Sequence, residues 1–481
     1  MSNILKKYGY YLILAVIFAL GFFLRLKWLI ANPSFWDDEC SIAWNVVHKN
    51  YSDFFSVLAY TQVAPPFFMI TAKFFTKIFG VSDFVLRLTP FLFGILSMIM
   101  FLLVSNKLFE NKITVVISNL IFSINQALVN YSSEFKQYSC DVFFTLLCFY
   151  LFINLLGKSS FRKNLAYAFI FSISLWFSFV SVFIISAGLL VILIKQLKEK
   201  SFNLKNFSAL LFPIFANCIF YLWFYIIKTY TENITELNNY WANSYIARDF
   251  SNLGMLLKNV INYFMFPSNF LLLIVLAMVI GLIVLFKKRF YLTLILTLTV
   301  VFEGFASWLG LYPFEKRVVL FLLPIVLIFI SAIFELFNPK QKLKSAVVSL
   351  LFILIFFQSF VYCRAYIKTP KPTRGYYSRE MMEVMLSKIK PGDIIVVNRY
   401  SRTDFAYYAT YHKIKNKVIQ EGQTGNRQAF LNSLNPGYYW FYMPFGPSPT
   451  YDKWFADKKR HVLFELNGNG YPSKMVYLKS D

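Results

Sequence analysis

Near the start of the chain the sequence reads YGYYLILAVIFALGFFLRLKWLI at residues 8–30 and then FWDDECS at residues 35–41. The first stretch is long enough to cross the hydrocarbon core of a bilayer, which takes about 20 apolar residues. The second places Asp37, Asp38 and Glu39 just beyond it, although the chain holds only 24 acidic residues. Carboxylates at a membrane surface are stable when they face water, a cation or a substrate. The two stretches predict a retained membrane anchor followed by either a solvated acidic loop or a chemical site.

Apolar residues dominate most of the chain. Hydrophobic residues make up 58% and charged residues 15% of 481 positions, a balance that excludes a soluble protein. Residues 165–194 are long for one span and are expected to form a tight hairpin that turns near residues 178–181. We therefore expect an all-α polytopic membrane protein with about eleven spans. They are expected near residues 8–30, 85–104, 113–130, 140–156, 165–178, 180–194, 208–228, 269–286, 291–309, 317–335 and 345–363.

The basic residues predict how these spans are oriented. The net charge is +24, but the Lys and Arg residues lie in short clusters between spans, such as residues 195–205 and 287–289. This is the pattern of cytoplasmic loops and argues against nucleic-acid binding. The N-terminus is then cytoplasmic, and an odd number of spans places everything after Cys363 outside. The expected location is the plasma (inner) membrane, as a multi-pass protein.

Four outer segments follow from this orientation: residues 31–84, 131–139, 229–268 and a short turn at 311–317. The first of them is the expected catalytic loop. It contains an apolar stretch, residues 66–79, that carries two lysines one turn apart and is expected to be a helix lying on the membrane surface. Pro66 suits the start of that helix. The long third segment is expected to cover the site as a lid around Tyr240 and Trp241, since long loops are often functional.

The composition changes from about Thr369. Residues 381–389 have helical spacing, residues 391–393 form a turn and residues 394–397 read as a strand. A similar unit covers residues 429–443, and a further strand is expected at 461–465. The tail therefore predicts a small soluble α/β domain, residues 369–481, outside the membrane and behind a transmembrane domain of residues 1–365. At about 110 residues it can hold its own core.

A second group of polar residues lies between the third and fourth expected spans, at residues 130–139. If this segment forms a helical turn, Glu134 and Tyr138 share one face. Asp141 lies just beyond this segment. A polar linker is the simpler interpretation of this segment alone. On the same outer surface, however, Asp38 and Glu39 can converge with it over one cavity.

Cations and metal ligands on this surface can be assigned by residue type. Arg87, Lys316 and Arg317 are natural partners for a phosphate. The chain has only three His residues, so a His-ligated zinc site is poorly supported. Carboxylates such as Asp38 and Glu134 would instead hold a hard divalent cation, Mg²⁺ or Mn²⁺.

Five motifs occur in a fixed order: Asp38-Glu39, Pro65-Pro66-Phe67-Phe68 with Phe79-Gly80, Arg87-Leu88, then Tyr131, Glu134, Lys136 and Tyr138, and last Tyr312-Pro313-Phe314 with Arg317 and Pro324. On these motifs, residues 5–365 resemble the polyprenol-phosphate-sugar-dependent glycosyltransferases of the GT-C class. The resemblance is to the protein-mannosyltransferase-like bacterial branch, which includes the lipid A aminoarabinose transferases. Two positions depart from the pattern. Ala64 stands where the family often has His or Asn, and Lys136 stands where one branch has Arg. Other relatives place the second acid further on, so the resemblance leaves Asp141 in competition with Glu134 for that role.

The resemblance implies a membrane enzyme that moves a sugar from a polyprenyl-phosphate donor to a hydroxyl of an acceptor glycan, lipid or protein. Asp38 would be the general base, Glu39 would orient it or hold a cation, and Glu134 would be a further catalytic acid. A single displacement would invert the sugar.

The resemblance also implies a substrate-binding set and a source of positive charge for the leaving phosphate. Arg317, Lys136 or a divalent cation would offset the charge on that phosphate. The substrate-binding set would comprise Asp37, Arg87, Lys136, Tyr138, Asp141, Lys316 and Arg317.

The main alternative is a lipid or polysaccharide transporter (a flippase). Transporters tend to show internal repeats and charges at the bilayer midplane. No repeat is visible here, and the acidic groups lie at the outer interface. Glu303, inside the ninth expected span, is the exception.

Overall fold

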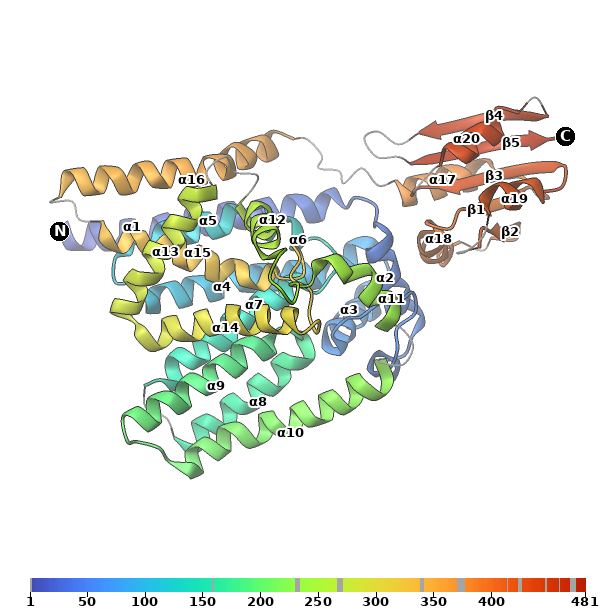
Figure 1. Ribbon diagram of the computed structural model, residues 1–481. Helices are drawn as coiled ribbons and strands as arrows, with labels where there is room; N and C mark the ends of the chain where they lie inside the picture. Colours follow the sequence, from blue (N-terminus) through green and yellow to red (C-terminus); the bar gives the residue numbers. More distant parts are fainter. Residues whose placement is uncertain are drawn as a thin grey trace.

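The computed structural model describes residues 2–157, 160–229, 234–265, 271–337, 341–369, 377–412, 414–422, 426–445, 448–457, 459–467 and 473–481. A bundle of helices is followed by a small sheet with its own helices, and the sheet lies at one end of the bundle, near α2 (Figure 1). The N-terminus lies at the opposite end of the bundle. In the predicted outer segment 229–268, residues 230–233 and 266–268 lie outside the described residues.

The bundle is built from these helices: α1 Ser2–Ala31, α2 Asp37–His48, α3 Pro66–Phe79, α4 Asp83–Leu108, α5 Lys112–Ile124, α6 Gln126–Tyr131, α7 Tyr138–Leu155, α8 Phe161–Phe177, α9 Ser181–Lys198, α10 Leu204–Thr229, α11 Ile234–Trp241, α12 Leu253–Met265, α13 Leu271–Lys288, α14 Phe290–Trp308, α15 Leu323–Ser331 and α16 Lys342–Lys368. Short 3₁₀ turns add η1 Ser52–Phe55, η2 Ala242–Ser244, η3 Leu320–Leu322 and η4 Ala332–Leu336.

The predicted polytopic helical fold is confirmed. Within the described part of the chain, six helices are long and apolar enough to cross a membrane: α1, α4, α7, α9, α13 and α14. Every predicted span coincides with helical segments, and the hairpin turn lies between Phe177 and Ser181 as expected. The number of eleven crossings stays a prediction. The third span is not one helix, because Asn125 ends α5 and its side chain caps α6 by accepting a hydrogen bond from the backbone N–H of Leu128 (3.2 Å).

Apolar side chains fill the bundle and also cover its outside. Inside, the rings of Phe101 and Phe122 stack with their centroids 4.3 Å apart, and those of Phe152 and Phe171 lie 4.6 Å apart. Outside, large side chains such as Phe212 remain 72% exposed. Helices that are apolar on every face are expected where the surroundings are lipid.

Helix α3 has the bounds that its sequence predicts. Pro66 occupies the first turn, where its missing N–H leaves no hydrogen bond unmade, and Gly80 ends the helix with a φ of 81°. Phe74, Ile78 and Phe79 are each more than half exposed. Its position on the membrane surface stays a prediction.

The tail forms a five-stranded sheet in the order β2-β1-β3-β5-β4. β1 is parallel to β2 and β3, whereas β5 is antiparallel to β3 and β4. The two predicted helix–turn–strand units and the strand near residue 461 are confirmed, while α18, α20, β2 and β5 were not predicted. The elements of the tail are α17 Ser378–Lys388, β1 Ile394–Val397, α18 Arg402–Ala409, β2 Lys417–Gln420, α19 Arg427–Asn432, β3 Gly437–Met443, α20 Pro449–Phe455, β4 Arg460–Asn467 and β5 Lys474–Ser480.

The tail shares a hydrophobic core with residues 31–84, the first of the predicted outer segments. Met381 of α17 and Tyr407 of α18 belong to the same buried cluster as Phe35 and Ile42, which lie in and around α2. The rings of Phe35 and Tyr407 have centroids 5.5 Å apart. The proposed boundary near residue 369 therefore separates two parts of the chain that pack together through α2.

Candidate functional site

The three acidic residues of the FWDDECS stretch form the first turn of α2. Carboxylates are favourable there because the N-terminus of a helix carries partial positive charge. Successive helical residues point about 100° apart, so the three side chains face different partners. Their three environments define the site.

Glu39 faces the interior of the protein. Its side chain is fully buried and pairs with Arg87 of α4, whose Nη2 lies 3.3 Å from each carboxylate oxygen. Glu39 also accepts a hydrogen bond from the backbone N–H of Phe135 (2.7 Å). Arg87 donates further hydrogen bonds to the Ser133 carbonyl (2.9 Å) and to the Pro33 carbonyl (2.6 Å). This pair joins α2, α4 and the segment between α6 and α7. The Arg87 guanidinium donates its hydrogen bonds to groups of the protein itself.

Asp38 faces two cations from distant parts of the chain. Arg317 donates to its Oδ2 at 3.0 Å, and the ammonium of Lys136 lies 3.7 Å from the same oxygen. Lys136 also donates to the side chain of Gln62 (2.9 Å), a residue that the sequence did not single out. The Nε–H of Arg317 is buried and, among the described residues, has no hydrogen-bond partner. The structure thus brings together Asp38, Lys136 and Arg317, and their roles stay predictions.

Burial and neighbouring charges shift the titration of both cations. Burial lowers the pKa of the Lys136 ammonium, and Arg317 lowers it further, while Asp38 and Glu134 oppose the shift. Burial would also lower the pKa of the Arg317 guanidinium, but Tyr138 and Asp38 outweigh it and raise that pKa. Arg317 therefore stays charged, whereas Lys136 is the cation that can lose its proton.

Two tryptophan rings cover the Arg317 guanidinium. Its central carbon lies 5.1 Å from the ring centre of Trp36 and 5.9 Å from that of Trp241, distances typical of cation–π contacts. Trp241 ends α11, in the segment expected to cover the site. The contact gives that expectation a physical basis, since the ring shields the cation from water.

Asp37 faces the tail. The hydroxyl of Thr403, in α18, donates a hydrogen bond to its Oδ1. Burial raises the pKa of the Asp37 carboxyl, while the Thr403 hydrogen bond and Lys136 act against that shift. Asp37, predicted as a substrate contact, is thus bound by a residue 366 positions further along the chain.

The segment between α6 and α7 is not a helical turn. Residues 132–137 form bends and turns, so Glu134 and Tyr138 do not share a helix face in the predicted way. Both are buried, and both lie within electrostatic range of Lys136 or Arg317. Asp141 is buried in α7, and none of the contacts between described residues joins it to Asp38.

The residues around Asp38 do not fit a metal site. Two cations within 4 Å of one carboxylate oxygen repel a divalent ion. In the described part of the chain, no group of three or more His, Cys, Asp or Glu residues could hold a metal. Metal binding by Asp38 and Glu134 therefore stays a prediction that these contacts do not support.

Asp83, at the start of α4, binds three side chains of the tail, and the sequence did not predict these contacts. It accepts hydrogen bonds from the hydroxyls of Tyr407 and Tyr408 (2.9 Å each) and pairs with Arg379 (2.9 Å). All three donors belong to the tail. The sequence carries no signal for this, because nothing local shows that the tail folds back onto α4.

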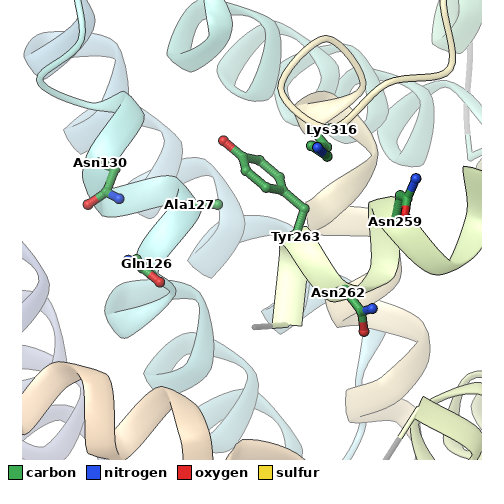
Figure 2. A pocket seen from close by; sticks show the side chains of 7 residues that line it. All are labelled: Gln126, Ala127, Asn130, Asn259, Asn262, Tyr263 and Lys316. Carbon is green, nitrogen blue, oxygen red and sulfur yellow. The ribbon is translucent and has the colours of Figure 1, made fainter. Parts of the chain in front are cut away.

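Lys316 lies apart from its neighbour Arg317. Its side chain lines a pocket between α6 and α12, together with the side chain of Tyr263 (Figure 2). Consecutive residues of one turn thus face two different spaces.

Residues 63–223 match a protein family described as dolichyl-phosphate-mannose-protein mannosyltransferase. This segment contains Lys136 and Arg87 but ends before Arg317 and begins after Asp38. No curated protein matches the sequence of this chain.

Among solved structures, the chain is similar to ArnT from Cupriavidus metallidurans bound to undecaprenyl phosphate, with a TM-score of 0.60 and 12% identity over 98% of both chains. The same protein in the apo state gives a TM-score of 0.58 at 10% identity, again over 98% of both chains. The apo Archaeoglobus fulgidus oligosaccharyltransferase gives 0.50 at 14% identity, over 91% of this chain and 70% of the other. The TM-scores show a shared fold, and at such low identities they show nothing beyond the fold. The family match and the fold confirm the predicted GT-C resemblance and the predicted class, a membrane glycosyltransferase.

Proposed function

We propose that this chain transfers a sugar from a polyprenyl-phosphate carrier to an acceptor hydroxyl at the outer face of the membrane. The observation that carries the proposal is the position of Asp38, a carboxylate within 4 Å of Arg317 and Lys136 at the end of the bundle where the tail lies. A base beside two phosphate-binding cations is what transfer from a phosphate donor requires. The similar ArnT structure contains undecaprenyl phosphate, which supports this donor class.

The reaction would proceed as a single displacement. The donor phosphate replaces Asp38 as the partner of the Arg317 guanidinium, whose free Nε–H can complete a bidentate contact. Asp38, released from Arg317, removes the proton of the acceptor hydroxyl as its oxygen attacks the anomeric carbon. The bond between that carbon and the phosphate oxygen breaks, and the sugar inverts. Arg317 and Lys136 balance the charge on the departing polyprenyl phosphate, a role that we assign to them in preference to a divalent cation.

Four other predicted site residues would act through these three. Glu39 and Arg87 are positioning residues, because their buried pair fixes the first turn of α2 against α4 and Phe135. Glu134 helps to keep Lys136 protonated. Asp37, held by Thr403, fixes the same turn from the side of the tail.

The test separates binding from turnover. Asp38→Asn should lower sugar transfer about 100-fold or more, as expected for loss of a general base. The same variant should bind undecaprenyl phosphate as tightly as the wild type or more tightly, since it removes an anion beside the phosphate. Arg317→Lys should weaken that binding about tenfold, because a point charge replaces a planar fork. Asp249→Asn and Arg248→Lys, on the outer segment 242–252, are the matched controls.

Transfer would be followed in vesicles as release of undecaprenyl phosphate from lipid-linked hexoses and pentoses, with and without EDTA. Normal transfer by Asp38→Asn would remove Asp38 as the base. If EDTA abolishes transfer, a metal ion and not Arg317 with Lys136 balances the charge of the leaving phosphate. A wild-type protein that moves the lipid across the bilayer without transferring its sugar would favour the transporter alternative.

A further inference from the structure

A pocket of about 330 Å³ lies beside the Asp38 cluster, between α6 and α12 (Figure 2). Its volume falls within the range of small-ligand sites, roughly 300–1,000 Å³. Its lining comes from three segments far apart in the chain. The lining residues are Gln126, Ala127 and Asn130 of α6, Asn259, Asn262 and Tyr263 of α12, and Lys316 of the turn before η3.

The lining has a distinctive chemistry. Four of the seven side chains are carboxamides, each with two N–H donors and one carbonyl acceptor, and Tyr263 adds a hydroxyl. None of the seven is a carboxylate, and the single charge is the Lys316 ammonium. Most of the exposed wall is nevertheless apolar, with the carboxamides and the ammonium at separate points. This combination suits a ring that carries hydroxyls on an apolar frame, with one negative charge attached.

The walls of the pocket are fixed to one another. Asn125, the cap of α6, donates a hydrogen bond to the Phe264 carbonyl in α12 (2.8 Å). The hydroxyls of Tyr131 and Tyr263 are hydrogen-bonded across the gap. Asn130 accepts a hydrogen bond from Tyr362 of α16 (3.2 Å). A site whose polar groups are already held in place binds with little loss of conformational freedom.

The pocket also borders the proposed catalytic cluster. The ring of Tyr131 packs edge-on against Tyr138, with centroids 5.1 Å apart, and Tyr138 lies within electrostatic range of Asp38 and Arg317. Lys316 and Arg317 are neighbours in the chain, so the pocket and the Asp38 cluster meet at this turn. Tyr131 thus contacts both a lining residue of the pocket and Tyr138.

We propose that this pocket binds the carbohydrate of the lipid-linked donor, with its carboxamides bonded to the sugar hydroxyls and Lys316 facing the phosphate. The inference rests on the proposed function and adds a binding site for one half of the donor. The pocket selects the sugar, while Arg317 and Lys136 bind the phosphate whatever sugar it carries.

The experiment compares two probes: undecaprenyl phosphate, and undecaprenyl phosphate that carries a hexose or a pentose. Asn259 and Asn262 lie three residues apart on one face of α12, so Asn259→Ala and Asn262→Ala remove two amides from one wall. Each should weaken binding of the preferred sugar-bearing lipid about fivefold, as for one lost hydrogen bond. Binding of bare undecaprenyl phosphate should not change. Gln126→Ala should give the same selective loss from the opposite wall, and the exposed Asn243→Ala in η2 is the control.

Several outcomes would overturn the inference. One is that the variants weaken binding of both lipids equally. Another is that they raise only the acceptor concentration that transfer requires. A third is that they leave binding unchanged although the wild type distinguishes the two lipids. A wild type that binds both lipids equally would also exclude a sugar site. Failure of the proposed function looks different, because the wild type would then transfer no sugar, whether or not it binds the lipids. Thermal unfolding of each variant shows whether a loss of binding follows from misfolding.

Discussion

At the scale of single residues, three adjacent carboxylates have three different tasks. Glu39 is buried against Arg87, Asp38 meets two cations at the end of the bundle where the tail lies, and Asp37 is held by the tail. The helix geometry of α2 causes this, because each step along a helix turns the side chain by about 100°. Only Asp38 combines partial exposure with direct contacts to two cations, so it is the residue in the proposed chemistry.

Lys136 gives a prediction in its pH dependence. Its pKa is lowered by burial, so it loses its charge at a lower pH than an ordinary lysine, whose value is about 10.4. Binding of undecaprenyl phosphate should therefore weaken as the pH rises toward that range. Lys136→Arg should move this alkaline loss to higher pH, because an arginine stays charged.

The measurement is the Kd for undecaprenyl phosphate between pH 7 and pH 10, with Lys258→Arg on the exposed side of α12 as the control. An alkaline loss at the same pH in Lys136→Arg would assign it to another group.

At the scale of elements, α2 is held to α4 by the buried Glu39–Arg87 pair. Leaving one partner of such a pair unmatched costs about 3–5 kcal/mol, whereas replacing both by apolar residues of similar volume is often tolerated. The pair therefore predicts strongly non-additive effects. It also explains why Arg87, expected to bind phosphate, has no donor directed at Asp38.

Arg87→Met should lower the unfolding temperature strongly, and Glu39→Met/Arg87→Met together should recover much of it. Thermal unfolding of the detergent-solubilised protein measures both. Wild-type stability in Arg87→Met alone would show that the pair does not stabilise the fold.

At the scale of the whole molecule, the tail is packed onto the first outer loop. Buried Asp83, Tyr407 and Tyr408 form one network with the partly exposed Arg379 across this contact. Asp404 of α18 is fully buried close to Asp37 and Cys40 of α2, and accepts a hydrogen bond from Ser378 (3.3 Å). Docking of the tail thereby helps to position the turn that carries Asp38.

The docking should depend on pH. Burial, and then the charge of Asp37, raise the pKa of the Asp404 carboxyl well above its ordinary value of 3.8. The docked state therefore binds more protons than the undocked state, and docking weakens as the pH rises from about 4 through the raised pKa. Asp404→Asn should remove much of this dependence and strengthen docking at neutral pH by about 1–3 kcal/mol.

Hydrogen exchange of α18 between pH 5 and pH 9 reports the docking, with the exposed Glu383→Gln in α17 as the control. Equal pH dependence in Asp404→Asn and the wild type would contradict the assignment.

Local patterns in the sequence predicted much of the fold. Apolar runs located the helical segments, Pro66 and Gly80 bounded α3, and two helix–turn–strand units located parts of the tail sheet. These features depend on residues close together in the chain, which is why composition and periodicity reveal them. The break at Asn125 was missed because the apolar pattern continues across it. Elements such as β2 and β5 were missed because short strands are defined by their neighbours in the sheet.

The sequence by itself determined the class of protein and most members of the site: apolar spans, an acidic turn and a set of outer cations. Only the tertiary structure decided which of these residues meet. Arg317 reaches Asp38 across 279 positions and Thr403 reaches Asp37 across 366. Such contacts are fixed by how the bundle and the tail pack, a global balance of buried area and satisfied polar groups that no local pattern encodes. The same packing turned Arg87 inward, and placed Lys316 at a pocket lined by residues that no motif had marked.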